Sequence, residues 1–138
     1  MGKILVVEDD SDIREMVEFK LACLGHEVVV AHDGERGLEQ ARAERPDLVL
    51  ADWMMPRLSG LDMFLAMRAD PELAHLPVML MSAKASDTDV RLGRAAGVDD
   101  YVVKPFNLLD LARRVEVLLD AARSTPLELA LMDLVAVS

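Results

Sequence analysis

The chain has 138 residues, enough for one domain with a buried core and too few for two. Its 52% hydrophobic and 29% charged residues predict a globular protein, and no apolar run reaches the ~18–20 residues that cross a bilayer. The formal net charge of −10 argues against binding to nucleic acid, because phosphate contacts need clustered Lys and Arg. One cysteine, Cys23, excludes an internal disulfide, and its helical context predicts a small buried side chain. The start of the chain lacks a signal-peptide pattern, so we expect a cytoplasmic protein without a membrane partner.

Short apolar runs alternate with amphipathic segments along the chain. In chain order they predict strand 3–8, helix 11–24, strand 27–31, helix 34–44, strand 47–51, helix 61–69, strand 78–82, helix 87–96, strand 100–103 and helix 108–122. Ser11 is the expected N-cap of the first helix, and Gly25 and Gly97 are expected to close the first and fourth helices. Wholly apolar strands that alternate with helices predict a parallel sheet covered on both faces. The expected fold class is therefore α/β, a doubly wound, flavodoxin-like sheet of order 2-1-3-4-5 in a three-layer sandwich.

The last part of the chain differs from the rest, so we divide the sequence into a domain at 1–123 and a tail at 124–138. Thr125 and Pro126 break the last helix, and Leu127 to Val137 form an apolar run with few charges. Three interpretations of the tail stay open: the start of a linker, an extra helix that packs on the domain or a neighbour, or a remnant of an expression vector.

Five polar residues stand at the ends of predicted strands: Glu8, Asp9, Asp52, Ser82 and Lys104. Because the carboxyl ends of parallel strands meet at one edge of a sheet, these side chains are expected to converge in one cleft. Neighbouring carboxylates repel one another unless a cation neutralises them, and oxygen ligands favour Mg²⁺, with Mn²⁺ as an alternative. The pattern therefore predicts a site for a divalent cation and a phosphoryl group.

The positions of these residues suggest separate tasks. The two adjacent acids after the first strand are the better metal ligands, and the backbone carbonyl of Met54 could complete the metal shell. Asp52 is the best nucleophile because it ends the central strand, and a carboxylate can form an aspartyl phosphate. Lys104 would neutralise one phosphoryl oxygen, and the Ser82 hydroxyl would bind another.

In this order the motifs resemble the receiver domain of response regulators in two-component signalling. The matching segments are Val6 to Asp10, Leu50 to Pro56, Gly60, Met81 to Ala83 and Gly97 to Phe106. The resemblance covers residues 3 to about 122. It implies a signalling phosphoprotein rather than an enzyme, because a receiver catalyses only its own phosphorylation and dephosphorylation. A downstream output protein or domain would take up the signal.

The resemblance also assigns roles to individual residues. A histidine sensor kinase, or a phosphotransfer protein, would donate the phosphoryl group to Asp52. Glu8, Asp9, Asp52 and the Met54 carbonyl would hold Mg²⁺, and Lys104 would pair with Asp52 before the transfer.

The response to phosphorylation is expected at Ser82 and Tyr101, which match the family's switch positions. The phosphoryl oxygens would draw Ser82 inward, and Tyr101 would then rotate from an outward to an inward position. The face made by the fourth helix, the fifth strand and the fifth helix would change its shape as a result. The resemblance further implies a cis peptide bond between Lys104 and Pro105.

Two further expectations follow from the resemblance. Met54 and Lys84 match positions that tune hydrolysis, and their bulk predicts a phosphoryl group that lasts minutes or more. Asp100 and Arg114 match a pair that joins two copies of a receiver across the face just described. The other charged residues expected on or near that face are Asp99, Arg91, Arg94 and Arg113.

Three alternatives remain at this point. A haloacid-dehalogenase-like phosphatase uses similar groups, but its nucleophile follows the first strand in an Asp-x-Asp pattern, whereas Asp52 comes later and precedes Trp53. A flavin-binding protein of the same fold needs a phosphate loop after the first strand, where this chain has acids. A degenerate receiver would serve only for docking, and the presence of Asp52 and Lys104 argues against it.

Overall fold

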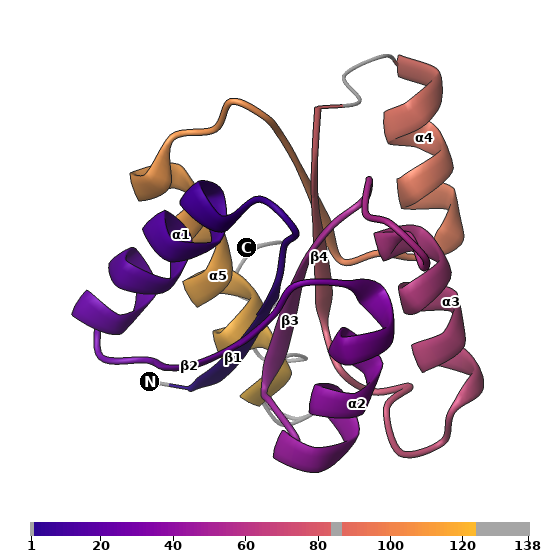
Figure 1. The fold of residues 1–138 in the computed structure, drawn as a ribbon, viewed down its shortest axis with the longest axis horizontal. Coiled ribbons are helices and arrows are strands. Elements are labelled where there is room, and N and C mark those ends of the chain that lie inside the picture. Colours follow the sequence, from indigo (N-terminus) through magenta and orange to yellow (C-terminus); the bar gives the residue numbers. More distant parts are fainter. Residues whose placement is uncertain (1, 84–86, 124–138) are drawn as a thin grey trace, which may run out of the picture.

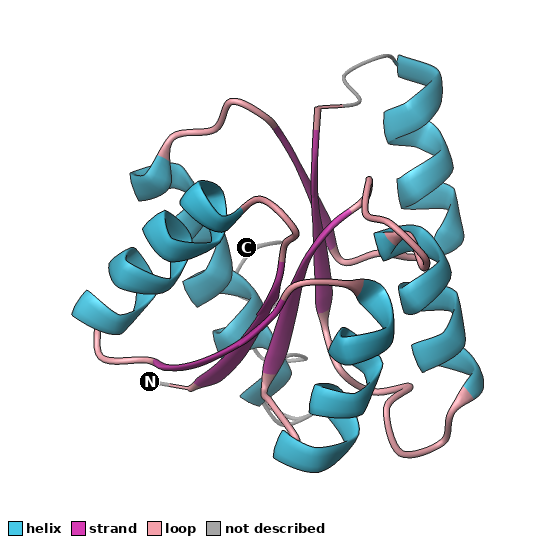
Figure 2. Ribbon diagram, viewed as in Figure 1, coloured by secondary structure: helices cyan, strands magenta, loops and turns pink. Residues whose placement is uncertain are grey.

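A five-stranded parallel sheet with helices on both faces forms the centre of the protein in a computed structural model, which describes residues 2–83 and 87–123 (Figures 1 and 2). The strands are β1 (Lys3–Val7), β2 (Glu27–Ala31), β3 (Leu48–Asp52), β4 (Val78–Ser82) and β5 (Asp100–Val103). The helices are α1 (Ser11–Cys23), α2 (Gly34–Glu44), α3 (Gly60–Ala69), α4 (Asp87–Ala96) and α5 (Leu108–Arg123). The strand order is β2-β1-β3-β4-β5, which confirms the predicted fold. Lys84 and the tail at 124–138 lie outside the described residues.

Successive residues of each strand pack on opposite faces of the sheet. In β1, Leu5 and Val7 join the core beneath α2, α3 and α4, whereas Ile4 and Val6 join the core beneath α1 and α5. Figure 1 shows the same division, with α1 and α5 on one side of the strands and the other three helices on the opposite side. Burial on both faces explains why β1, β3 and β4 are apolar except at one end of each strand.

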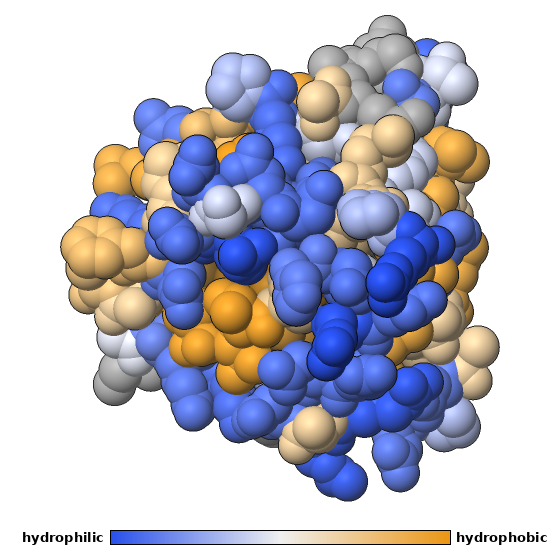
Figure 3. Space-filling view, in the orientation of Figure 1, coloured by the Kyte–Doolittle hydropathy of each residue, from blue (hydrophilic) through white to orange (hydrophobic). Residues whose placement is uncertain are grey.

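The surface is largely polar. Figure 3 shows mainly hydrophilic residues on the face it presents, in keeping with the net charge of −10. No helix in the described part of the chain combines the length and the apolar character that crossing a membrane requires.

The first helix departs from prediction at its N-cap and at its cysteine. Asp10, not Ser11, is the N-cap of α1: its Oδ1 accepts hydrogen bonds from the N–H groups of Asp12 (2.9 Å) and Ile13 (3.1 Å). Cys23 is exposed rather than buried, because it follows the buried Leu21 by two residues and so lies about 200° around the helix. Gly25, with φ 93°, follows the C-cap as predicted.

Candidate metal and phosphoryl site

The ends of four strands bring the predicted site residues to one edge of the sheet. Glu8 directly follows β1, and its N–H donates to the Ala31 carbonyl of β2 (3.0 Å). β3 ends at Asp52, one residue after the predicted end of this strand at 51. Ser82 is the last residue of β4. Lys104 follows β5, and its N–H donates to the Ser82 carbonyl at 2.7 Å. The parallel register thus aligns all four positions at the carboxyl end of the sheet.

Three carboxylates converge at this edge. Glu8, Asp9 and Asp52 each offer an oxygen, and these oxygens lie within 4.8 Å of one another. Glu8 and Asp52 are buried, and Asp9 is exposed at the mouth of the site. Oε2 of Glu8 is buried and has no hydrogen-bond partner within the described residues. A buried oxygen without a donor, next to two more carboxylates, fits a hard divalent cation such as Mg²⁺.

Lys104 holds two of these acids together. Its Nζ lies 2.5 Å from Oε1 of Glu8 and 3.1 Å from Oδ2 of Asp52. Burial alone lowers the pKa of the Lys104 ammonium, but the two carboxylates outweigh burial and raise that pKa above its usual value. Lys104 is therefore a fixed positive charge beside Asp52. The peptide bond between Lys104 and Pro105 is cis, as the resemblance implied.

Glu8 has the most strongly perturbed carboxyl group of the site. Its side chain has no exposed surface, and its pKa lies at about 8 rather than the usual 4.5, chiefly because burial disfavours the charged form. The neighbouring Asp52 carboxylate is the second cause of this raised pKa, whereas Lys104 acts in the opposite direction. Without a metal, the Glu8 carboxyl therefore holds its proton more tightly than an exposed glutamate does, so a cation that binds here competes with that proton.

Tyr101 occupies an inward position in this structure. It is 4% exposed, and its ring meets the ring of Trp53 edge to face, with centroids 5.8 Å apart and planes at 80°. Burial raises the pKa of the Tyr101 hydroxyl, and a hydrogen bond with Ser82 offsets part of the rise. The sequence did not predict the contact between Tyr101 and Trp53. Its only signal is that Trp53 directly follows Asp52.

The β3–α3 loop begins directly after Asp52. Met54 is 58% exposed there, so its side chain is open to solvent close to Asp52. Gly60 closes the loop: its N–H donates to the Trp53 carbonyl at 2.9 Å, and a Cβ at this position would lie 2.2 Å from the Asp52 carbonyl oxygen. The loop therefore requires glycine there, a reason that the motif alone did not reveal.

Several of the charged residues expected on the α4–β5–α5 face form contacts within the chain. Arg114 Nη1 lies 2.9 Å from both carboxylate oxygens of Asp100, and its Nε lies 2.9 Å from Asp110. Asp99 lies instead 3.4 Å from Arg68 at the end of α3. Asp100 and Arg114 are thus already paired in the single copy.

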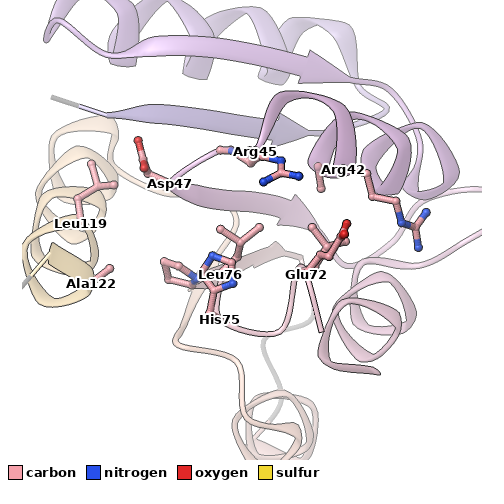
Figure 4. A pocket seen from close by; sticks show the side chains of 12 residues that line it. Arg42, Arg45, Asp47, Glu72, His75, Leu76, Leu119 and Ala122 are labelled. Atoms are coloured by element: carbon pink, nitrogen blue, oxygen red, sulfur yellow. The ribbon is translucent and has the colours of Figure 1, made fainter. Parts of the chain in front are cut away.

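A separate cavity of ≈ 410 Å³ lies at the opposite end of the sheet (Figure 4). Asp47 and Pro77, which line it, directly precede β3 and β4, whereas Asp52 and Ser82 end those strands. Apolar residues of α5 and the loop before β4 line the cavity together with Arg42 and other charged side chains. The acidic cluster, rather than this cavity, is therefore the candidate functional site.

The comparisons with known proteins agree with this geometry. The sequence profile of the family described as the response regulator receiver domain matches residues 4–116. The chain is 39% identical over 127 residues to the DNA-binding response regulator MtrA of Mycolicibacterium smegmatis, covering 92% of this chain and 54% of that protein. It is 32% identical to the receiver domain of Francisella response regulator 1452, with a TM-score of 0.84 over 89% of this chain and all of that one. The chemotaxis protein CheY4 of Vibrio cholerae gives 31% identity and a TM-score of 0.80 over 86% of this chain and 98% of that one. The chain spans about half the length of the curated relatives it matches.

Proposed function

Because the chain belongs to the family of response regulator receiver domains, signalling proteins of two-component systems, we propose that Asp52 accepts a phosphoryl group from the phosphohistidine of a sensor kinase or phosphotransfer protein. The observation that carries this proposal is the position of Lys104 Nζ, 3.1 Å from Oδ2 of Asp52, beside a cluster of three carboxylates. The family match favours this function over the phosphatase and flavin-binding alternatives. The cytoplasmic location stays a prediction from the sequence.

Each residue of the site has a distinct part in this proposal. Glu8, Asp9, Asp52 and the Met54 carbonyl would hold Mg²⁺, which would supply positive charge to the phosphoryl oxygens when bound. A carboxylate oxygen of Asp52 attacks the phosphorus, and the bond from phosphorus to the donor histidine nitrogen breaks, with its electron pair staying on that nitrogen. Lys104 moves its contact from Asp52 to a phosphoryl oxygen and keeps the new negative charge neutralised.

The experiment is phosphorylation by acetyl phosphate in Mg²⁺, followed by intact-protein mass spectrometry. We expect the wild type to gain the mass of one phosphoryl group, and Asp52→Asn, which keeps the shape of the side chain, to gain none. Lys104→Ala should be labelled far more slowly, because the charge beside the acceptor is lost. If the wild type took up no label, or if Asp52→Asn were labelled equally, the chain would be a docking receiver or would use another acceptor.

The lifetime of the phosphoryl group is a second part of the proposal. Met54 follows Asp52 by two residues, and its side chain is exposed. Its bulk is expected to hinder an attacking water molecule. Lys84, the other residue expected to tune hydrolysis, lies outside the described residues. We expect a lifetime of minutes or more, shortened in Met54→Ala. A wild-type lifetime of seconds would contradict this role.

The output is proposed to pass through the α4–β5–α5 face, to a second copy of the chain or to a downstream protein or domain. The relatives named above include one DNA-binding response regulator, MtrA, and this chain covers 54% of its length. For two copies to share the Asp100–Arg114 pair, the contact within one chain has to open. Light scattering with beryllofluoride and Mg²⁺ tests this: the mass should double in the wild type and stay single in Arg114→Ala. An unchanged wild-type mass would exclude this dimer.

A further inference from the structure

Gly93 lies inside α4, at a position where glycine is unfavourable. Among residues in helix interiors, only proline is worse, because the backbone freedom of glycine is lost there. Gly93 is buried within α4 (Asp87–Ala96), which runs along the right-hand side of Figure 1. A buried glycine in the middle of a ten-residue helix needs a packing reason.

The reason is the space that two aromatic rings occupy. A Cβ at Gly93 would lie 3.1 Å from Cδ2 and 3.2 Å from Cε2 of Tyr101, and 3.7 Å from Cζ3 of Trp53. The two rings therefore pack against the bare backbone of α4. A methyl group at residue 93 would force the Tyr101 ring to move by a few tenths of an ångström. A larger side chain would occupy the space that the Tyr101 ring now fills.

This packing connects α4 to the phosphoryl site by two routes. Trp53, which contacts the Tyr101 ring, is the residue directly after Asp52. The Tyr101 hydroxyl forms a hydrogen bond with Ser82, at the end of the neighbouring strand. A shift of the Tyr101 ring away from residue 93 would therefore change its contact with Trp53, beside Asp52, and its hydrogen bond with Ser82.

We propose that Gly93 is a positioning residue of the receiver: the absence of a side chain there provides the space that Tyr101 needs for its inward position against Trp53. The size of residue 93 thereby sets the balance between the inward and outward positions of Tyr101. The size of residue 93 also sets how strongly the α4–β5 surface changes when Asp52 is phosphorylated. The effect on signalling rests on the proposed function, whereas the effect on the two rings does not.

The test uses Gly93→Ala and Gly93→Leu in the whole 138-residue chain. Trp53 is the only tryptophan and is 6% exposed, so acrylamide quenching of its fluorescence reports whether Tyr101 still covers it. In metal-free protein we expect the quenching constant to rise roughly twofold in Gly93→Leu and by less in Gly93→Ala, following the volume added beside the ring. With Mg²⁺, the apparent affinity for beryllofluoride should fall about tenfold in Gly93→Leu, because the inward state becomes less populated.

The control repeats both substitutions in a Tyr101→Ala background. Alanine and leucine both favour helix more than glycine does, so an effect on α4 alone would persist without the ring. An effect that acts through the ring should disappear in that background. The proposal is overturned if quenching is unchanged in both single variants, or if it changes equally with and without Tyr101. If the wild type binds no beryllofluoride, the proposed function fails, and the metal-free quenching still decides the role of Gly93.

Discussion

Replacing Glu8 by glutamine keeps the shape of a fully buried side chain and removes its titration. The amide oxygen can still accept from the Lys104 ammonium, which lies 2.5 Å from Oε1 in the wild type. The substitution therefore separates the charge of residue 8 from its packing. We expect the metal-free variant to be more stable than the wild type at alkaline pH and the difference to vanish in acid.

The size of the effect follows from the raised pKa of Glu8. In the unfolded chain Glu8 loses its proton near pH 4.5, whereas in the folded protein it keeps that proton until about pH 8. Because the folded pKa is the higher one, the stability that protonated Glu8 contributes is complete below the unfolded pKa and is lost as the pH rises through the folded pKa. The slope is at most ~1.4 kcal/mol per pH unit, so the wild type should lose about 2–4 kcal/mol relative to Glu8→Gln between about pH 5 and about pH 8.

The assay is urea unfolding in the presence of a chelator, followed by Trp53 fluorescence at a series of pH values. All other titrating groups are common to the two proteins, so the difference between their free energies of unfolding isolates Glu8. Added Mg²⁺ should restore stability to the wild type at pH 8 and do so far less in Glu8→Gln, because one ligand is missing. Parallel stability curves across this pH range would refute the argument that burial and Asp52 hold the proton on Glu8.

Two further substitutions test how the loops are held. Gly60→Ala would place a Cβ 2.2 Å from the Asp52 carbonyl oxygen, so the β3–α3 loop must move. We expect the free energy of unfolding to fall by roughly 2 kcal/mol or more. An unchanged melting temperature would show that the loop adapts freely. Arg68→Met keeps an apolar side chain but removes the guanidinium, which lies over the ring of Phe64 and donates to the Ala74 and Leu76 carbonyls. We expect it to lower the free energy of unfolding by about 1–3 kcal/mol in urea, and a loss near zero would mean that water replaces the guanidinium.

Local residue patterns determined most of the fold. Strands such as β3, apolar up to its final Asp52, alternate with amphipathic helices, and this alternation was enough to predict the strand order, because parallel strands joined by right-handed crossovers allow few arrangements. The same logic predicted that Glu8, Asp52, Ser82 and Lys104 would meet, since parallel strands end at a common edge. The cap of α1 was less predictable, because Asp10 and Ser11 are both good N-caps and the choice depends on which oxygen reaches the free N–H groups.

Only the tertiary structure decided the contacts between side chains from distant strands. The raised pKa of Glu8 depends on how deeply the chain buries it and on its distance to Asp52 and Lys104, which are 44 and 96 residues away in the sequence. The packing of Tyr101 and Trp53 against Gly93 likewise depends on how α4 lies over β5, and no spacing along the chain encodes that. Residue types and their order thus determined which groups reach the site, whereas the packing of three layers determined their protonation and their positions.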